Sequence, residues 1–248
     1  MKKIIFLAAI LLATAFEMPA QPGPMSDSGA ALIKFFGDNN SFSATCELKM
    51  TNPAGAEIMS GTMTYAMLVD KVRTEVDMAR MKSSQLPAGA IDSLKKMNMA
   101  DIASIVRPDQ KMIYLIYPGL KSYVKMPVPM PDASTNKNIK IVKTKIGDET
   151  VDGHPCVKNK AVVTDDNGQT HEAILWNATD MKDFPLQIQS TEQGMTALMH
   201  FKNINFTKPD SSLFDPPAGF TVYPDMQQLM MTVMQKSTPP APAPTPTP

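Results

Sequence analysis

The sequence predicts an α+β protein built around one strongly curved antiparallel β-sheet of about ten or eleven strands. Several segments alternate between apolar and polar residues, which is typical of strands with one buried face. Turn-forming Pro, Gly, Asn and Asp residues separate these segments at short intervals, as in hairpins. Only three or four segments show helical spacing. No internal repeat or change of composition divides the 248 residues before the last dozen, so a single domain is expected.

The N-terminus has the features of a secretory signal peptide. Lys2 and Lys3 precede an apolar run at residues 4–16, which is too short to span a membrane. Ala13 and Ala15 supply the small residues of an A-x-A cleavage site. We expect cleavage after residue 15, or alternatively after residue 20. No cysteine follows the run, so no lipid attachment is expected, and the mature chain is expected to be periplasmic or secreted and not membrane-spanning.

The charge balance argues against nucleic acid and charged membrane surfaces as partners. The chain has 24 basic and 24 acidic residues. Removal of residues 1–15 removes two lysines and no acids, which leaves 22 basic and 24 acidic residues and a net charge of about −2. The sequence contains no basic stripe, whereas proteins that bind nucleic acid carry a marked excess of positive charge.

The first half of the mature chain predicts two helices and three strands. Residues 26–37 carry helix-capping residues at both ends. Strands are expected at residues 42–51, at 57–67 and in the segment from Lys71, and a second helix is expected at 87–99. The apolar positions of the first and third strands are Phe42, Ala44, Cys46, Leu48 and Met50, and then Val72, Thr74, Val76 and Met78.

The second half predicts hairpins and a C-terminal helix. The expected strands lie at 101–109, 111–118, 121–127, 139–150 and 155–164, and three more follow up to about residue 206. A Pro-rich loop is expected at 127–137 and a hairpin turn at Asp165–Gly168. The last helix is expected at 223–236. The domain therefore covers residues 26–236, and residues 237–248 form a Pro-rich disordered tail.

The order of elements and several short motifs resemble a known family. The motifs are "FSATCEL" (42–48), "IVRPDQKMIYLIYPGLKSYVKMP" (105–127), G-x-x-C (153–156), "ILWNATDMKDFPLQIQS" (174–190) and "DSSLFDPPAGF" (210–220). In these features the chain resembles a family of bacterial exported proteins defined only as a domain of unknown function. That family in turn resembles the lipoprotein-carrier superfamily of LolA, LolB and RseB types. The resemblance spans about residues 30–223.

The resemblance implies an unclosed half-barrel, with helices covering its concave side and an apolar cavity that holds acyl chains. Lipoprotein carriers use an arginine to latch the helical lid, and Arg107 is the nearest position in this sequence. The other functional residues of the superfamily have no individual counterparts here.

The methionine content is unusual, with 21 in the chain. Met226, Met230 and Met234 recur at the i, i+4, i+8 spacing of one helix face. One interpretation is core packing by a flexible side chain, and a second is an adaptable lining for variable apolar ligands. A third is Cu(I) binding, since soft sulfur ligands select that ion.

We expect a set of apolar side chains from strands and helices to line the cavity. Tyr114 is included because tyrosines cluster in the central hairpin. The expected lining residues are Phe42, Leu48, Met50, Met63, Tyr65, Val76, Met78, Leu94, Met97, Tyr114, Met230 and Met234.

No catalytic motif is present, and the protein is not expected to be an enzyme or to need a cofactor. The sequence lacks G-x-S-x-G, a Walker loop, G-x-G-x-x-G and H-E-x-x-H. The three histidines, His154, His171 and His200, are scattered, and no metal site is expected from them.

The two cysteines leave three alternatives open. The first is a disulfide between Cys46 and Cys156, as expected of two cysteines in an oxidising compartment. It would close a loop of about 110 residues and contribute about 4 kcal/mol in the chain-entropy model. The alternatives are two separate buried thiols, or a reactive or metal-bound pair of His154 and Cys156 in "VDGHPC".

These observations favour an exported, non-enzymatic binding protein that holds a lipid or another hydrophobic ligand. The alternative is an envelope sensor or interaction module with a protein partner, and the third hypothesis is periplasmic Cu(I) binding through methionines.

Overall fold

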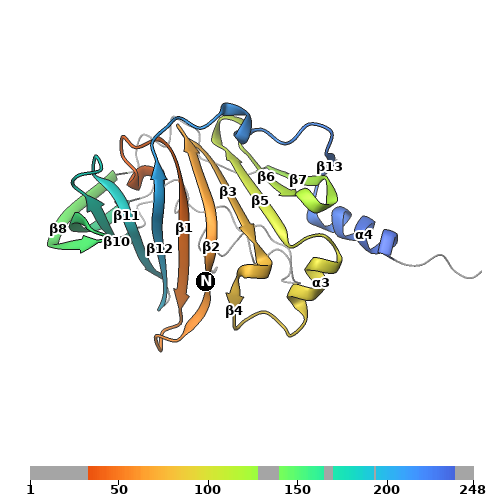
Figure 1. Cartoon of the computed structure of the whole chain (residues 1–248), viewed down its shortest axis with the longest axis horizontal. Helices are drawn as coiled ribbons and strands as arrows, with labels where there is room; N and C mark the ends of the chain where they lie inside the picture. The colour runs from red at the N-terminus through yellow and green to blue at the C-terminus, as the bar shows by residue number, and fades with distance from the viewer. Residues whose placement is uncertain (1–32, 128–139, 165–169, 193, 238–248) are drawn as a thin grey trace, which may run out of the picture.

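The computed structural model describes residues 33–127, 140–164, 170–192 and 194–237 (Figure 1). The signal peptide, the start of the helix expected at 26–37, most of the Pro-rich loop, the turn at Asp165–Gly168 and nearly all of the tail lie outside the described residues. These predictions are therefore untested.

The described residues form one curved, unclosed antiparallel sheet with a few helices, which confirms the predicted fold class (Figure 1). The sheet has thirteen strands rather than ten or eleven. The strands are β1 (Ser41–Thr51), β2 (Glu57–Leu68), β3 (Lys71–Asp77), β4 (Lys82–Ser83), β5 (Asp101–Arg107), β6 (Met112–Tyr117), β7 (Ser122–Pro127), β8 (Lys140–Val151), β9 (His154–Thr164), β10 (Thr170–Ala178), β11 (Phe184–Glu192), β12 (Met195–Asn205) and β13 (Thr221–Tyr223). The additional strands are short: β4 has two residues and β13 has three.

The sheet consists of two meanders joined at a pair of strands that are distant in sequence. Its order is β13-β7-β6-β5-β3-β2-β1-β12-β11-β10-β9-β8, and β4 pairs with β2 outside this path. The pairing of β1 with β12 joins the first meander to the second. β13 pairs with β7 in the parallel direction, whereas the other described pairs are antiparallel. The β1–β12 pair therefore lies near the middle of the sheet.

One face of the sheet, here called the inner face, carries the main apolar core. Phe42, Cys46 and Leu48 alternate along β1 with half-buried or exposed Ser43, Thr45 and Glu47. The apolar face extends to the two neighbouring strands, because Cys46 lies opposite Met63 of β2 and Phe201 of β12. The alternating pattern in the sequence therefore corresponds to one side of the sheet.

Two helices and a short helical segment pack against this core. Helix α3 (Ala90–Lys96) contributes buried Leu94, and α4 (Met226–Ser237) contributes buried Leu229 and Val233. The segment before β1 inserts Phe36, which is 1% exposed. These elements cover part of the inner face.

Helix α3 is shorter than the expected 87–99. It ends where Asn98 takes a positive φ of 55°, a left-handed conformation that stops the helix. The β6–β7 turn packs closely against this end. A Cβ atom on Gly119 would lie 2.5 Å from the carbonyl oxygen of Asn98, so only glycine fits this contact.

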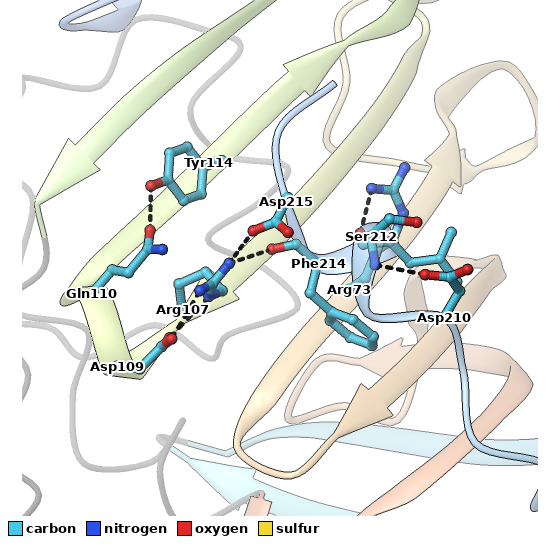
Figure 2. A network of polar contacts seen from close by, with 10 residues as sticks. Arg73, Arg107, Asp109, Gln110, Tyr114, Asp210, Ser212, Phe214 and Asp215 are labelled. Carbon is cyan, nitrogen blue, oxygen red and sulfur yellow. Dashed lines mark hydrogen bonds and ion pairs between the residues drawn. The ribbon is translucent and has the colours of Figure 1, made fainter. Parts of the chain in front are cut away.

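The segment 207–220, here called the crossover segment, runs past one end of the first strands (Figure 1) and packs on the opposite, outer face against β3, β5 and β6 (Figure 2). It contains the 3₁₀ turn Ser211–Phe214, which Asp210 caps by accepting a hydrogen bond from the Ser212 amide at 2.8 Å. Phe214 is fully buried in a second apolar cluster. That cluster also contains Leu68, Ala103, Ile105, Tyr114 and Ile116.

Arginine side chains hold the backbone of the crossover segment (Figure 2). Arg107 donates to the carbonyl of Phe214 at 3.0 Å and pairs with Asp215. It also forms a two-bond pair with Asp109, at 2.9 and 2.8 Å. Arg73 donates to the carbonyl of Leu213 at 3.0 Å. These contacts join the C-terminal part of the chain to strands of the first meander.

Candidate functional site

The inner face and the helices that cover it bring together ten of the twelve residues expected to line a cavity. Seven are buried in the main core: Phe42, Leu48, Met50, Met63, Tyr65, Met78 and Leu94. Val76, Met97 and Met230 are partly buried against it. The structure therefore assembles most of the set in one apolar interior, and their binding of a ligand remains a prediction.

Tyr114 lies elsewhere. It belongs to the second cluster, and its hydroxyl donates to Gln110 at 2.6 Å (Figure 2). Its neighbours Ile113 and Leu115 in β6 belong to the main core. Tyr114 therefore faces the crossover segment, and its assignment to the inner-face lining is wrong.

Met234 is also misplaced, because 59% of it is exposed. Each i to i+4 step in an α-helix advances about 40° around the axis. Met226 and Met230 pack against the core, whereas Met234 lies outside it. The three thioethers thus lie in different environments. The Tyr117 hydroxyl donates to the Met226 sulfur at 3.7 Å, and the Cu(I) hypothesis stays a prediction.

Five aromatic rings form the centre of the interior. They are Phe36, Phe42, Tyr65, Phe184 and Phe201. The rings of Phe42 and Tyr65 are stacked with centroids 5.7 Å apart, and Phe201 meets Tyr65 edge-on at 5.5 Å. Contacts of this kind stabilise beyond their buried area and hold the Tyr65 ring in one orientation.

The Tyr65 hydroxyl is an unsatisfied polar atom within this apolar centre. Tyr65 is 3% exposed, and its oxygen has no hydrogen-bond partner among the described residues. Burial raises its pKa, and the nearby Cys46 raises it further. The hydroxyl therefore stays protonated and keeps a hydrogen available for donation.

The interior is electrically neutral over the part of the chain that the structure describes. Arg107 is the one charged residue among the buried side chains there, and it serves the crossover segment on the outer face. Burial also raises the pKa of the Cys46 thiol from 9.0 to about 12. The thiol is therefore neutral at physiological pH and behaves as a small apolar group.

The two cysteines are free and buried, so the structure contains no Cys46–Cys156 disulfide. Three strands separate β1 from β9 in the sheet, which places the two cysteines roughly 19 Å apart along it. Both belong to the buried main core, so it is the intervening strands that keep them apart. The alternative of two separate thiols is the one that the structure contains.

The "VDGHPC" stretch is a structural corner. Asp152 and Gly153 both have positive φ, 50° and 87°, as in the two-residue hairpin turns that Asp-Gly favours. His154 pairs through Nδ1 with Asp180 at 2.9 Å, and Asp152 pairs with Nε2 of His200 at 2.7 Å. The described residues contain no group of three or more His, Cys, Asp or Glu that could hold a metal ion. His154 therefore ties the β8–β9 hairpin to the turn between β10 and β11, and Asp152 ties it to β12.

Sequence reasoning missed several members of the interior. Three phenylalanines were not expected in the lining: Phe36, Phe184 and Phe201. For Phe201 a signal existed, because it lies two residues after Met199 in β12 and therefore on the same face. The role of Arg107 was also unforeseen. It fastens the crossover segment on the outer face, away from the helices that cover the inner face.

The sequence matches a family described as "Domain of unknown function (DUF4412)" over residues 42–184, which is more than half of the chain. The chain belongs to the DUF4412 family. This confirms the prediction of a domain-of-unknown-function family. The matched region runs from the first strand to the start of β11, so it includes the aromatic centre except for Phe36 and Phe201.

Several solved structures are similar to this DUF4412 chain. The lipoprotein LppX of Mycobacterium tuberculosis is 11% identical, with a TM-score of 0.39, over 73% of this chain and 96% of LppX. A LolA superfamily protein from Nitrosomonas europaea is 8% identical, with a TM-score of 0.37, over 73% and 93%. A chain of the MucA/MucB complex of Pseudomonas aeruginosa is 16% identical, with a TM-score of 0.37, over 80% and 64%.

A search of curated proteins found no match. None of the helices in the described part of the chain is long and apolar enough to cross a membrane.

Proposed function

We propose that this protein is an exported, non-enzymatic binding protein that holds a lipid or another hydrophobic ligand between the inner face of the sheet and helices α3 and α4. Export rests on the N-terminal pattern of Lys2, Lys3, an apolar run and an A-x-A site. The ligand would enter by displacing the short helices from the sheet. No cofactor is needed for such a role.

The distribution of methionine carries the proposal. Fourteen of the 21 methionines belong to the main core or pack against it. Seven are buried: Met50, Met59, Met63, Met67, Met78, Met81 and Met99. The other seven are partly buried: Met97, Met126, Met181, Met195, Met199, Met226 and Met230. Methionine is unbranched and polarisable, so it repacks around irregular apolar shapes at low cost.

The way the helices cover the interior also supports binding. Helix α4 has twelve residues and rests on the sheet through Leu229 and Val233, with Met226 contacting Tyr117. Helix α3 has seven residues. Short helices of this kind depend on tertiary contacts for their stability. A ligand that replaces those contacts can shift them.

A titration with diphenylhexatriene tests the proposal. This probe is an uncharged hydrocarbon without hydrogen-bonding groups, and it fluoresces strongly only away from water. We expect the delipidated protein to bind it saturably with about one site per chain. Fluorescence no greater than that produced by an unrelated β-sheet protein would refute the proposal.

Two neighbouring methionines of α4 supply matched variants. Met230 packs against the core, whereas Met231 is 50% exposed. Met230→Glu places a charge on the covered face of the helix, so it should weaken probe binding by about tenfold or more, since burying an unpaired charge is costly. Met231→Glu should leave binding within about twofold of the parent protein. Equal effects of the two variants would contradict the location of the site.

The second candidate function is recognition of an envelope protein through the sheet edge at β8. Val142 and Ile146 of this strand are 47% and 50% exposed, and the strand carries Lys140, Lys143 and Lys145. An exposed edge strand pairs readily with an extended segment of another chain. The partner that fits is an extended peptide with acidic residues opposite these lysines.

A photo-crosslinking residue at Val142 tests this candidate. It should capture one partner in the bacterial envelope, and the yield should fall at high salt because the pairing is electrostatic in part. The same residue at Val222, which is 51% exposed on β13 at the other edge, serves as the control. Identical products from both positions would refute a β8-specific partner.

A further inference from the structure

The buried hydroxyl of Tyr65 points to the chemical class of the ligand. We infer that the natural ligand of the interior is a neutral acyl ester, whose carbonyl oxygen accepts a hydrogen bond from Tyr65, rather than a free fatty acid. This inference rests on the proposed function, because it concerns the same interior. It adds one polar contact and one charge requirement to that function.

The hydrogen-bond inventory is the first step. A buried hydroxyl without a partner is destabilising, and folded proteins leave few such groups. None of the described side chains or carbonyls accepts from Tyr65. The nearby thiol of Cys46 is buried and neutral, because burial raises its pKa to about 12. Within the described part of the chain, the hydroxyl is therefore a donor without an acceptor.

The surroundings of the Tyr65 ring are the second step. The rings of Phe36, Phe42 and Phe201 lie within 5.5 to 5.8 Å of the Tyr65 ring, measured between centroids. An ordered water in such a place would need two to four polar partners, which aromatic rings do not supply. A ligand with one acceptor atom on an apolar chain satisfies the donor and fits the walls.

Charge is the third step. A carboxylate buried without a counter-charge is strongly disfavoured. In the described chain, the one buried cation is Arg107, which is engaged by Asp109 and Asp215 on the outer face. An ester carbonyl accepts a hydrogen bond and carries no charge. The interior thus selects an ester over the corresponding free acid.

Tyr65→Phe removes the donor and keeps the ring. We expect this variant to bind the methyl ester of cis-parinaric acid, a fluorescent acyl ester, about tenfold more weakly than the parent protein, because the ester carbonyl loses its partner. The affinity for diphenylhexatriene should fall less than the affinity for the ester, since the hydrocarbon has no acceptor. Tyr114→Phe is the matched control, because its hydroxyl lies in the second cluster and bonds to Gln110.

The free acid gives a second comparison. At alkaline pH, where cis-parinaric acid is ionised, the parent protein should bind it at least tenfold more weakly than the methyl ester. Equal affinity for acid and ester would overturn the requirement for a neutral ligand. Equal affinity of the parent protein and Tyr65→Phe for the ester would overturn the role of Tyr65.

Infrared spectroscopy of the parent protein keeps the inference falsifiable if Tyr65→Phe folds poorly. The carbonyl stretch of a ¹³C-labelled ester should move to lower frequency on binding, as expected for a hydrogen-bonded carbonyl. A bound ester whose carbonyl absorbs as in an alkane solvent would refute the contact. Absence of diphenylhexatriene binding would instead refute the proposed function itself, so the two failures are distinguishable.

Discussion

Phe214→Ala should destabilise the protein by removing the anchor of the crossover segment. Phe214 is fully buried and packs in the second cluster with Leu68, Ile105 and Ile116. Truncation of a fully buried phenylalanine to alanine costs about 3–5 kcal/mol. The bonds from Arg107 and Arg73 to the backbone carbonyls of Phe214 and Leu213 do not depend on the Phe214 side chain. The segment should therefore loosen without detaching, and the loss should stay within that range.

Urea unfolding followed by circular dichroism measures this loss. Leu213→Ala is the control, because Leu213 is 42% exposed and its truncation should cost under about 1 kcal/mol. Phe214→Ala should leave diphenylhexatriene binding nearly unchanged, since the second cluster lies on the outer face. A loss of less than about 1 kcal/mol for Phe214→Ala would refute the assignment of the crossover segment as an anchor of the fold.

Three further predictions follow from the same structure. Both thiols should resist a thiol reagent in the folded protein and react only after denaturation, since burial raises the pKa of Cys46 to about 12 and also raises that of Cys156; a mass two units lower, from a disulfide, would contradict the free pair. Arg107 lowers the pKa of Asp109 below its ordinary value of 3.8, so the ionised carboxylate stabilises the fold above about pH 4, and this stabilisation is lost as the pH falls through the lowered pKa. Because Asp109 is half exposed, the stabilisation should stay under about 1 kcal/mol. In unfolding measurements from pH 6 to pH 2, the free energy of unfolding should therefore fall less steeply for Asp109→Asn than for the parent protein. Gly119→Ala should lower the midpoint of thermal unfolding, because its Cβ would clash with the Asn98 carbonyl at the end of α3; a midpoint equal to that of the parent protein would show that this contact relaxes freely.

Strands were predictable wherever one face is polar. β1 alternates from Phe42 to Met50, and the structure places it at residues 41–51 against an expected 42–51. Each inward residue in that run is apolar and each outward residue is polar or charged, so the period of two decides both element and face. The hairpin at Asp152 and Gly153 followed in the same way from local turn chemistry.

The central strand β6 was not predictable to the same depth. Its sequence, "MIYLIY", is apolar on both faces, so alternation could not separate Tyr114 from Ile113. Tyr114 and Ile113 differ because the crossover segment covers only one face of β6. That segment lies about 100 residues further along the sequence. Local patterns contain no information about which distant segment will cover a strand.

The relation between the two cysteines depended on the topology in the same way. The sequence predicted strands in hairpins within one curved sheet but not the β1–β12 pairing that joins its two halves. That pairing places β9 four positions from β1 in the sheet order, and it separates Cys46 from Cys156. The unsatisfied hydroxyl of Tyr65 is likewise a property of the packed interior, since the alternating pattern of β2 marks the residue only as inward-facing.

Native mass spectrometry of the full chain, purified from a bacterial periplasm without detergent, tests the central claim most directly. The claim predicts a mass above that of the mature polypeptide, an adduct that disappears on delipidation, and an extracted lipid that is a neutral acyl ester. The adduct should be reduced in Tyr65→Phe and retained in Tyr114→Phe. A single mass equal to that of the bare polypeptide, unchanged by delipidation, would contradict the claim.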